Sequence, residues 1–173
     1  MRLFIAINFT GTVRRGLLAM RDELRSYAEH GNFTLPENLH LTLVFLGECS
    51  PSQTAAAKAA MDAATFEPFA VEIERMGRFR RADGDIVWAG VRECAQLMSL
   101  RRELARNLQD AGFILENREY RPHITLGREV VAPVRGRGAE TFAETVARVD
   151  LMRSERVFGK LRYTSVYAKD ASM

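Results

Sequence analysis

The sequence predicts an α+β fold made of two quasi-equivalent lobes. Stretches with the alternation of a β-strand are interspersed along the chain with stretches of helical periodicity. The pattern His-x-Thr-x, with an aliphatic residue at each x, also occurs twice, at residues 40–43 and 123–126. Each copy follows a strand and a long helix, which predicts that each lobe contributes one motif strand. Because the lobes interleave along the chain, we count residues 1–173 as a single domain.

The first part of the chain is expected to hold two strands and two helices. Thr10 is the expected N-cap of the first helix and Gly31 its C-cap. Pro36 excludes a helix just before the first motif, and Ser50-Pro51 is a typical start for the second helix. The expected bounds are residues 2–8 and 39–47 for the strands, and residues 11–29 and about 50–64 for the helices.

The remainder is expected to hold a hairpin, a helix and several strands. Asp83-Gly84 is a typical hairpin turn, which makes residues 78–85 an arginine-rich loop. Residues 141–152 are ambiguous: periodicity alone allows a short helix over residues 140–147, and a strand is the alternative. The expected bounds are residues 69–76, 86–91 and 161–168 for strands, 93–111 for the helix, and 134–138 for a flexible basic loop; the second motif strand follows Pro122.

Composition bounds the class of protein. A chain of 173 residues with 47% hydrophobic and 27% charged residues is typical of one globular domain, and it has no apolar run long enough to span a membrane. Cys49 and Cys94 form no spacing motif, so we expect free thiols and a cytoplasmic location. We also expect a monomer. Most basic residues are arginine, which suits phosphate binding but also results from a GC-rich genome.

The two motifs carry the candidate chemistry. In a strand, His40 and Thr42 point to one face while Leu41 and Leu43 point to the other, and the second motif repeats this arrangement. Histidine gives and takes protons near neutral pH, and a threonine hydroxyl donates a hydrogen bond to an anionic oxygen. One such histidine is usually structural, but only three histidines are present and two of them head the same pattern.

Two imidazoles and two hydroxyls suit an in-line displacement at phosphorus. One histidine takes the proton of the attacking water or hydroxyl, and the other protonates the departing oxygen. The hydroxyls stabilise the charge that builds up on the phosphoryl oxygens. The side chains handle both protons, so this chemistry requires no metal and we expect no cofactor.

The paired motifs resemble those of the 2H phosphoesterase superfamily. Residues 1–7, 36–47 and 121–128 are similar to the bacterial and archaeal RNA 2′,3′-cyclic phosphodiesterases, long labelled 2′-5′ RNA ligases, and residues 86–91 and 151–154 extend the likeness. The resemblance implies a bilobal, pseudo-symmetric fold with two antiparallel sheets flanking a central groove and helices outside. It also implies a strand that reaches residues 149–152.

The same resemblance implies an activity and roles. A 2′,3′-cyclic phosphate at an RNA end would be opened to a 2′-phosphate. His123 would be the general base, His40 the general acid, and Thr42 and Thr125 would hold the non-bridging oxygens. The expected partners are therefore RNA 3′ ends, including tRNA fragments, or small nucleotides.

Several further residues have two alternative roles. Arg128 would bind the phosphate only if Gly127 bends the strand, because in an unbroken strand it shares a face with Ile124 and Leu126. Arg121 has the right parity, but Pro122 intervenes. The residues that could either contact RNA or have only a structural or solvated role are Trp88, Arg78, Arg80, Arg81, Arg135 and Arg137.

Three other functions use the same residues. Run in reverse, the site joins a 5′-hydroxyl to a cyclic phosphate and acts as a 2′-5′ RNA ligase. A different pocket would make it a phosphodiesterase of 2′-5′ oligonucleotides or of small cyclic nucleotides. A protein that only binds RNA ends is the non-enzymatic alternative, against which the two intact His-Thr pairs argue.

Overall fold

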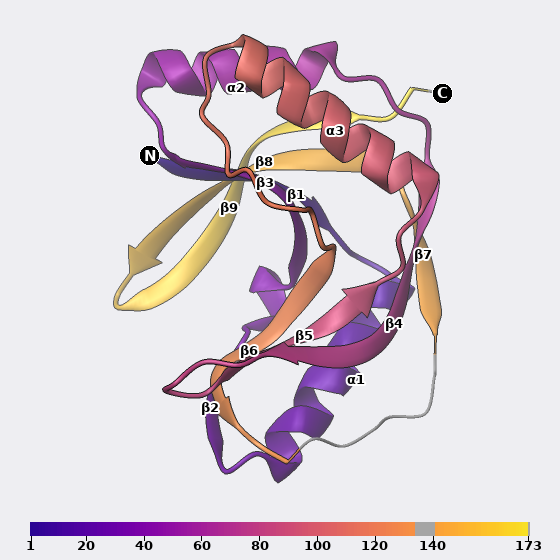
Figure 1. Cartoon of the computed structure of the whole chain (residues 1–173), viewed down its shortest axis with the longest axis vertical. Coiled ribbons are helices and arrows are strands. Elements are labelled where there is room, and N and C mark those ends of the chain that lie inside the picture. Colours follow the sequence, from indigo (N-terminus) through magenta and orange to yellow (C-terminus); the bar gives the residue numbers. More distant parts are fainter. Residues whose placement is uncertain (134–140, 173) are drawn as a thin grey trace.

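The computed structural model describes residues 1–133 and 141–172 and contains two antiparallel sheets (Figure 1). The four-stranded sheet has the order β3 (His40–Glu48), β1 (Arg2–Asn8), β8 (Arg148–Val157) and β9 (Lys160–Asp170). The five-stranded sheet has the order β2 (His30–Phe33), β6 (His123–Val131), β5 (Asp85–Val91), β4 (Phe69–Phe79) and β7 (Phe142–Val146). Each sheet therefore contains one motif strand, as the repeated pattern predicts.

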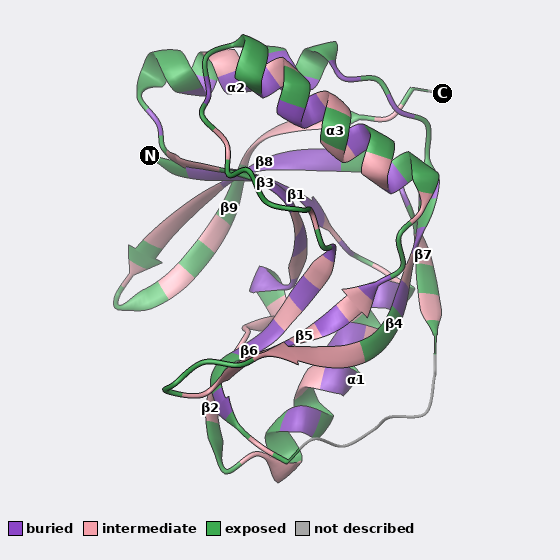
Figure 2. Cartoon of the chain, viewed as in Figure 1, coloured by how far each residue is buried: buried purple, intermediate pink, exposed green. Residues whose placement is uncertain are grey.

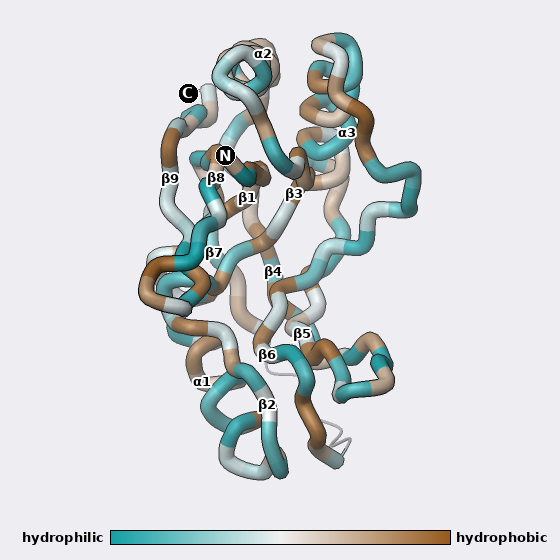
Figure 3. Tube along the Cα trace, turned by 90° about the vertical axis from the view of Figure 1, so that its left-hand side faces the viewer, coloured by the Kyte–Doolittle hydropathy of each residue, from teal (hydrophilic) through white to brown (hydrophobic). Residues whose placement is uncertain are grey.

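The helices divide between the sheets. α1 (Thr12–Tyr27) packs against β2, β6 and β7, whereas α2 (Pro51–Ala63) and α3 (Ala95–Asp110) pack against each other. α2 also contacts β9, and α3 contacts β3 and β4. α1 thus lies at one end of the molecule and the pair α2–α3 at the other (Figures 1 and 3). No helix in the described ranges is both long and apolar enough to cross a membrane.

The expected start and end of α1 are wrong. Thr10 does not cap the helix; Gly11 is the N-cap residue, and the Glu144 carboxylate of β7 accepts hydrogen bonds from the backbone N–H groups of Thr10, Gly11 and Val13. The helix ends at Tyr27, because Ala28 has an extended backbone and the next residues pair with β6 as β2. Gly31 is therefore a strand residue rather than a C-cap.

The hairpin loop and the ambiguous segment before β8 can now be compared with what the sequence predicts. Arg78 lies within β4, so the loop is shorter than expected, although the hairpin itself is confirmed. Residues 142–146 form a strand, which confirms the strand alternative over the helix, and β8 includes residues 149–152 as the resemblance implies. The basic loop with Arg135 and Arg137 lies outside the described residues.

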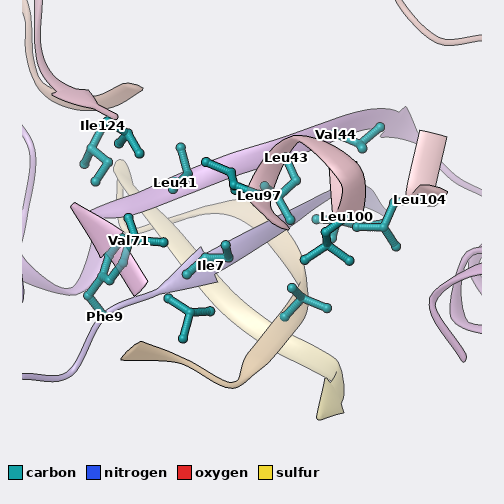
Figure 4. Packing of buried hydrophobic residues seen from close by; sticks show 14 of the residues in the cluster. Ile7, Phe9, Leu41, Leu43, Val44, Val71, Leu97, Leu100, Leu104 and Ile124 are labelled. Atoms are coloured by element: carbon teal, nitrogen blue, oxygen red, sulfur yellow. The ribbon is translucent and has the colours of Figure 1, made fainter. Parts of the chain in front are cut away.

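One core holds both motif strands in place. Leu41 and Leu43 of β3 and Ile124 of β6 are fully or almost fully buried and pack in one cluster with Ile7 and Leu97 (Figure 4). Burial alternates along the motif residues of both strands, so the histidines and threonines lie on the opposite, less buried face. The alternation is visible as buried and intermediate bands along β6 (Figure 2). The alternation expected from the sequence is confirmed.

The four-stranded sheet is strongly curled. β9 is three strands away from β3 in the sheet order, yet the Asn38 side-chain amide next to β3 donates a hydrogen bond to the Leu161 carbonyl of β9 at 2.9 Å. Asn38 belongs to the short 3-10 helix η1 (Pro36–Asn38). The inner face of the curl holds a small apolar cluster of Phe4, Ala6 and Met152, with Tyr163 against it.

Candidate active site

Both motif histidines are half-buried, and their strands are in contact. β3 and β6 touch each other although they belong to different sheets. His123 and Arg128 of β6 lie close enough to His40 for their charges to lower its pKa. The fold therefore brings the two sequence-predicted histidines and Arg128 into one electrostatic environment.

The hydrogen bonds of His40 define its tautomer. Its Nδ1 lies 2.7 Å from the Asn38 carbonyl oxygen, which can only accept, so Nδ1 carries the hydrogen. Its Nε2 lies 2.8 Å from Thr42 Oγ1, so in the neutral ring the Thr42 hydroxyl donates to Nε2. His40 Nε2 and the motif hydroxyl therefore form a direct pair.

Like His40, His123 is held by a hydrogen bond from Nδ1 to a backbone carbonyl, but its other contacts differ. Its Nδ1 donates to the Arg121 carbonyl oxygen at 2.7 Å, which directs Nε2 away from the backbone. Among the described residues, no hydrogen bond joins this ring to Thr125, in contrast to the first motif. Arg121 thus serves through its backbone, while its side chain is exposed and lies 3.7 Å from Glu119.

Each motif strand is also held by a hydroxyl group from outside it. The Tyr120 hydroxyl donates to the Thr42 carbonyl oxygen, and the Thr34 hydroxyl donates to the Thr125 carbonyl oxygen, both at 2.9 Å. β3 is an edge strand, and β2 covers β6 only as far as Phe33, so both carbonyls would otherwise lack a strand partner. These bonds fix the backbone that carries each threonine.

Two aromatic rings flank each imidazole. His40 packs against Phe4 and, edge to face, against Tyr163, with ring centroids 4.9 and 5.0 Å away. His123 packs edge to face against Phe79 at 5.2 Å and near Trp88 at 6.1 Å. Trp88 therefore lines the side of His123. Its ring lies over Gly77, where an added Cβ atom would approach the ring to 2.2 Å.

A β-bulge brings Arg128 to the face of His123. In the pairing with β5, Trp88 opposes Thr125 but Val87 opposes Gly127, so β6 has one extra residue at this point. Leu126 and Gly127 are consequently both buried, and Arg128 is exposed with the parity of Thr125 restored. The sequence predicted that Arg128 could share the face of His123 only if the strand bends at Gly127, and the bulge provides this bend.

β3 has a matching bulge that the sequence reading missed. Ala6 opposes Thr42 but Ile5 opposes Val44, so Leu43 and Val44 are both buried. Phe45 then occupies in β3 the position that Arg128 occupies in β6, five residues after the histidine. It is 65% exposed, and its ring lies 6.1 Å from that of Phe4. The spacing between each histidine and this residue was the available signal.

The electrostatics favour neutral His40 in the free protein. Burial lowers the pKa of His40, the hydrogen bond to the Asn38 carbonyl partly offsets this, and the charges of Arg128 and His123 lower the pKa further. Burial also raises the pKa of Tyr163, whose hydroxyl is influenced by Arg128, Arg2 and Arg156. An anion bound here would compensate these positive charges and raise the pKa of His40.

Among the described residues, the remaining candidates form no hydrogen bond with either imidazole. Arg78 binds Asp85 at 2.8 Å and the Ala132 carbonyl, which is a structural role within the hairpin. Arg80 and Arg81 are exposed, and the Arg81 guanidinium lies 6.0 Å from the Phe79 ring centre. Within the described ranges, no three His, Cys, Asp or Glu side chains gather in a way that could hold a metal ion. Cys49 and Cys94 are free thiols.

Two sheets that each present a His-x-Thr-x strand define the class of protein. The chain belongs to the 2′-5′ RNA ligase superfamily, which is part of the 2H phosphoesterases. The sequence model of this family matches residues 17–157.

Members of this family from an archaeon and a bacterium are similar to the chain over most of its length. The chain is 32% identical to an RNA 2′,3′-cyclic phosphodiesterase of Archaeoglobus fulgidus, over 86% of this chain and 87% of the relative. It is 30% identical to the Escherichia coli protein of the same name, over 94% and 92%. A crystal structure of Escherichia coli LigT complexed with 3′-AMP superposes with a TM-score of 0.87 at 27% identity, covering 99% of this chain and 98% of that one.

Proposed function

We propose that the protein hydrolyses RNA 2′,3′-cyclic phosphate ends to 2′-phosphates, in a reaction whose two proton transfers are made by His40 and His123. The observation that carries the proposal is the contact between β3 and β6, which brings the two motif strands together although they belong to different sheets. The proposed substrate is taken from the names of the relatives, which are RNA 2′,3′-cyclic phosphodiesterases. We also propose that it acts in the cytoplasm as a monomer.

The bonds made and broken follow from this assignment. His123 takes a proton from water as the water oxygen attacks phosphorus, and the bond between phosphorus and the ribose 3′-oxygen breaks. His40 donates its proton to that oxygen, which leaves a 3′-hydroxyl and a 2′-phosphate. Each transfer contributes roughly 10²- to 10⁴-fold in rate. This division of roles follows the family resemblance.

The neighbouring side chains have roles in the same step. Thr42, Thr125 and the Arg128 guanidinium hold the non-bridging oxygens and stabilise their growing charge. Phe45 offers an exposed apolar ring, backed by the buried ring of Phe4, which suits a nucleoside base. The bound phosphate raises the pKa of His40, so that the imidazolium required of a general acid is populated in the complex.

The experiment that tests the proposal uses His40→Ala, His123→Ala and the double variant with a cyclic-phosphate RNA end in the presence of EDTA. We expect wild-type turnover to persist and each single variant to lose at least about 10²-fold in kcat/KM. The double variant should lose little more than the worse single variant, because the residues act as a unit. Wild-type rates in either single variant would end the proposal.

Ligation is the second candidate, and the family description favours it. In this reaction the 5′-hydroxyl of a second RNA takes the place of the attacking water, its proton goes to His123, and His40 protonates the departing 3′-oxygen, which leaves a 2′-5′ linkage. Product analysis at high concentration of RNA 5′-hydroxyl ends separates the two directions. We expect the 2′-phosphate to dominate, since water is always in excess.

A further inference from the structure

The hairpin of β8 and β9 extends from the curled sheet as an arm (Figure 1). We define this arm as residues 154–163, from Ser154 on β8 to Tyr163 on β9. Ser154 pairs with Tyr163 and Arg156 with Leu161, so these residues share the face on which Tyr163 contacts His40. The arm therefore begins at one histidine of the site and leads away from it.

Two arginines lie on this face of the sheet. Arg2 pairs with Ser154 and shares the face of Phe4, and Arg156 is two residues further along β8, about 7 Å at the rise of a strand. Both are exposed, and both act together with Arg128 on the Tyr163 hydroxyl. Burial raises the pKa of this hydroxyl, and the positive charges of the three arginines act in the opposite direction.

The nearby acidic groups are engaged elsewhere. Glu48, which opposes Arg2 in β3, is paired with the N-terminal ammonium group at 3.3 Å. Glu155 points to the opposite face and is paired with Arg153 at 2.9 Å. Neither Arg2 nor Arg156 forms an ion pair with another described residue; Arg156 only donates to the Gly159 carbonyl oxygen at 3.2 Å. Both charges are available to an anion.

The tip of the arm carries an aromatic ring in an unusual backbone conformation. Phe158 is fully exposed and has a φ of 51°, and Gly159 follows with a φ of 78°. Positive φ at both central residues is typical of a type I′ turn, which favours Asn-Gly rather than Phe-Gly. A large ring that packs on nothing and occupies a disfavoured position indicates a contact with a ligand rather than with the core.

We propose that the arm is a second RNA subsite, in which Arg2 and Arg156 bind the phosphodiester upstream of the reactive phosphate and Phe158 stacks on a base beyond it. Aromatic stacking and arginine–phosphate contacts are the usual means of binding single strands without sequence preference. The preferred substrate is therefore a single-stranded oligonucleotide with a cyclic end rather than a mononucleotide. This inference rests on the proposed function and extends it.

The test compares kcat/KM for a single-stranded hexanucleotide ending in a 2′,3′-cyclic phosphate with that for a nucleoside 2′,3′-cyclic phosphate. We expect the ratio of the two to fall about tenfold in Arg156→Gln and Arg2→Gln, as expected for a lost charged hydrogen bond. Phe158→Asn keeps the turn and should lower the ratio about fivefold. The matched control is Arg162→Gln, an exposed arginine on the opposite face of the arm, which should keep the wild-type ratio.

Salt dependence and binding complete the test. For a 3′-phosphorylated hexanucleotide, the slope of log Kd against log salt should fall by about 0.7 for each lost phosphate contact. A ratio unchanged in Arg156→Gln and Phe158→Asn, or lowered equally in Arg162→Gln, overturns the subsite. If the wild type opens neither substrate, the proposed function fails instead, and hexanucleotide affinity measured by fluorescence anisotropy in the same variants decides the subsite by itself.

Discussion

At the scale of single residues, the two halves of the site are alike in layout and different in chemistry. Both histidines anchor Nδ1 on the backbone carbonyl two residues earlier. Only His40 has its Nε2 bound by the motif threonine. The equivalent fifth position is Phe45 in one strand and Arg128 in the other, so one lobe offers a ring and the other a cation. This asymmetry gives the site a direction that the repeated motif alone lacks.

Thr42 is expected to act through its hydroxyl rather than its shape. Thr42→Val removes the hydroxyl that donates to neutral His40 Nε2 in the free protein and, by the proposal, to the phosphate in the complex. The branched side chain is kept, and we expect kcat/KM to fall about 10²-fold. Thr42→Ser keeps the hydroxyl and should stay within a few-fold of the wild type. Initial rates on a cyclic-phosphate RNA end measure both. Equal rates in the valine and serine variants would contradict the assignment.

His40 is also expected to make stability depend on pH. Because its folded-state pKa lies below the ordinary value of 6.5, the unfolded chain binds a proton here more readily than the folded protein. This contribution is present above about pH 6.5 and is lost as the pH falls through the folded-state pKa.

Urea denaturation at pH 7.5 and pH 5.5 measures this contribution. We expect the wild type to lose more unfolding free energy between the two pH values than His40→Gln, which has no group to titrate at this position. Identical losses in the two proteins would show that the pKa of His40 is not lowered by folding.

The sequence predicts some of these residues and not others, for a physical reason. His40, Thr42, His123 and Thr125 follow from strand alternation, which is a local property. Tyr163 and Phe79 contact the histidines from strands remote in sequence. Their contacts depend on sheet order and curl, which no local pattern contains.

At the scale of elements, bulges and a distant cap shape the site. The bulges at residues 43–44 and 126–127 invert the alternation after each motif and expose the fifth residue on the site face. Hydrophobic alternation predicts a regular strand, so these bulges were not predicted, although Gly127 marked one of them. Likewise, α1 was expected to be capped by its own Thr10 and is instead capped by a carboxylate from β7.

Removing that cap should weaken the packing of α1 on the five-stranded sheet. Glu144→Gln loses the charge that accepts bonds from Gly11 and Val13, and we expect unfolding free energy to fall by about 1 kcal/mol. The control is Glu67→Gln, an exposed residue outside this contact, which should change stability by less than about 0.5 kcal/mol. Denaturant titration measures both. An unchanged midpoint in Glu144→Gln would show that the cap contributes nothing.

At the scale of the whole molecule, the chain passes repeatedly between the two sheets. β1 and β3 belong to one sheet, while α1 and β2, which separate them in sequence, belong to the other lobe. Because of this interleaving, neither lobe is a continuous piece of chain. Most of the elements could be predicted from the sequence, although β2 was not; the sheet that each strand joins could not be predicted, since it depends on long-range pairing.

The most direct measurement of the division of proton transfer uses a leaving group that needs no proton. In a 3′-deoxynucleoside 2′-(4-nitrophenyl phosphate), nitrophenolate replaces the ribose 3′-oxygen as the leaving group. Measured beside the cyclic phosphate, His40→Ala should recover most of its lost kcat/KM on the aryl ester, because its proton is no longer needed, whereas His123→Ala should stay low on both substrates. Equal losses for His40→Ala on the two substrates would contradict its role as the general acid, and wild-type rates in both variants would contradict the two-histidine reaction altogether.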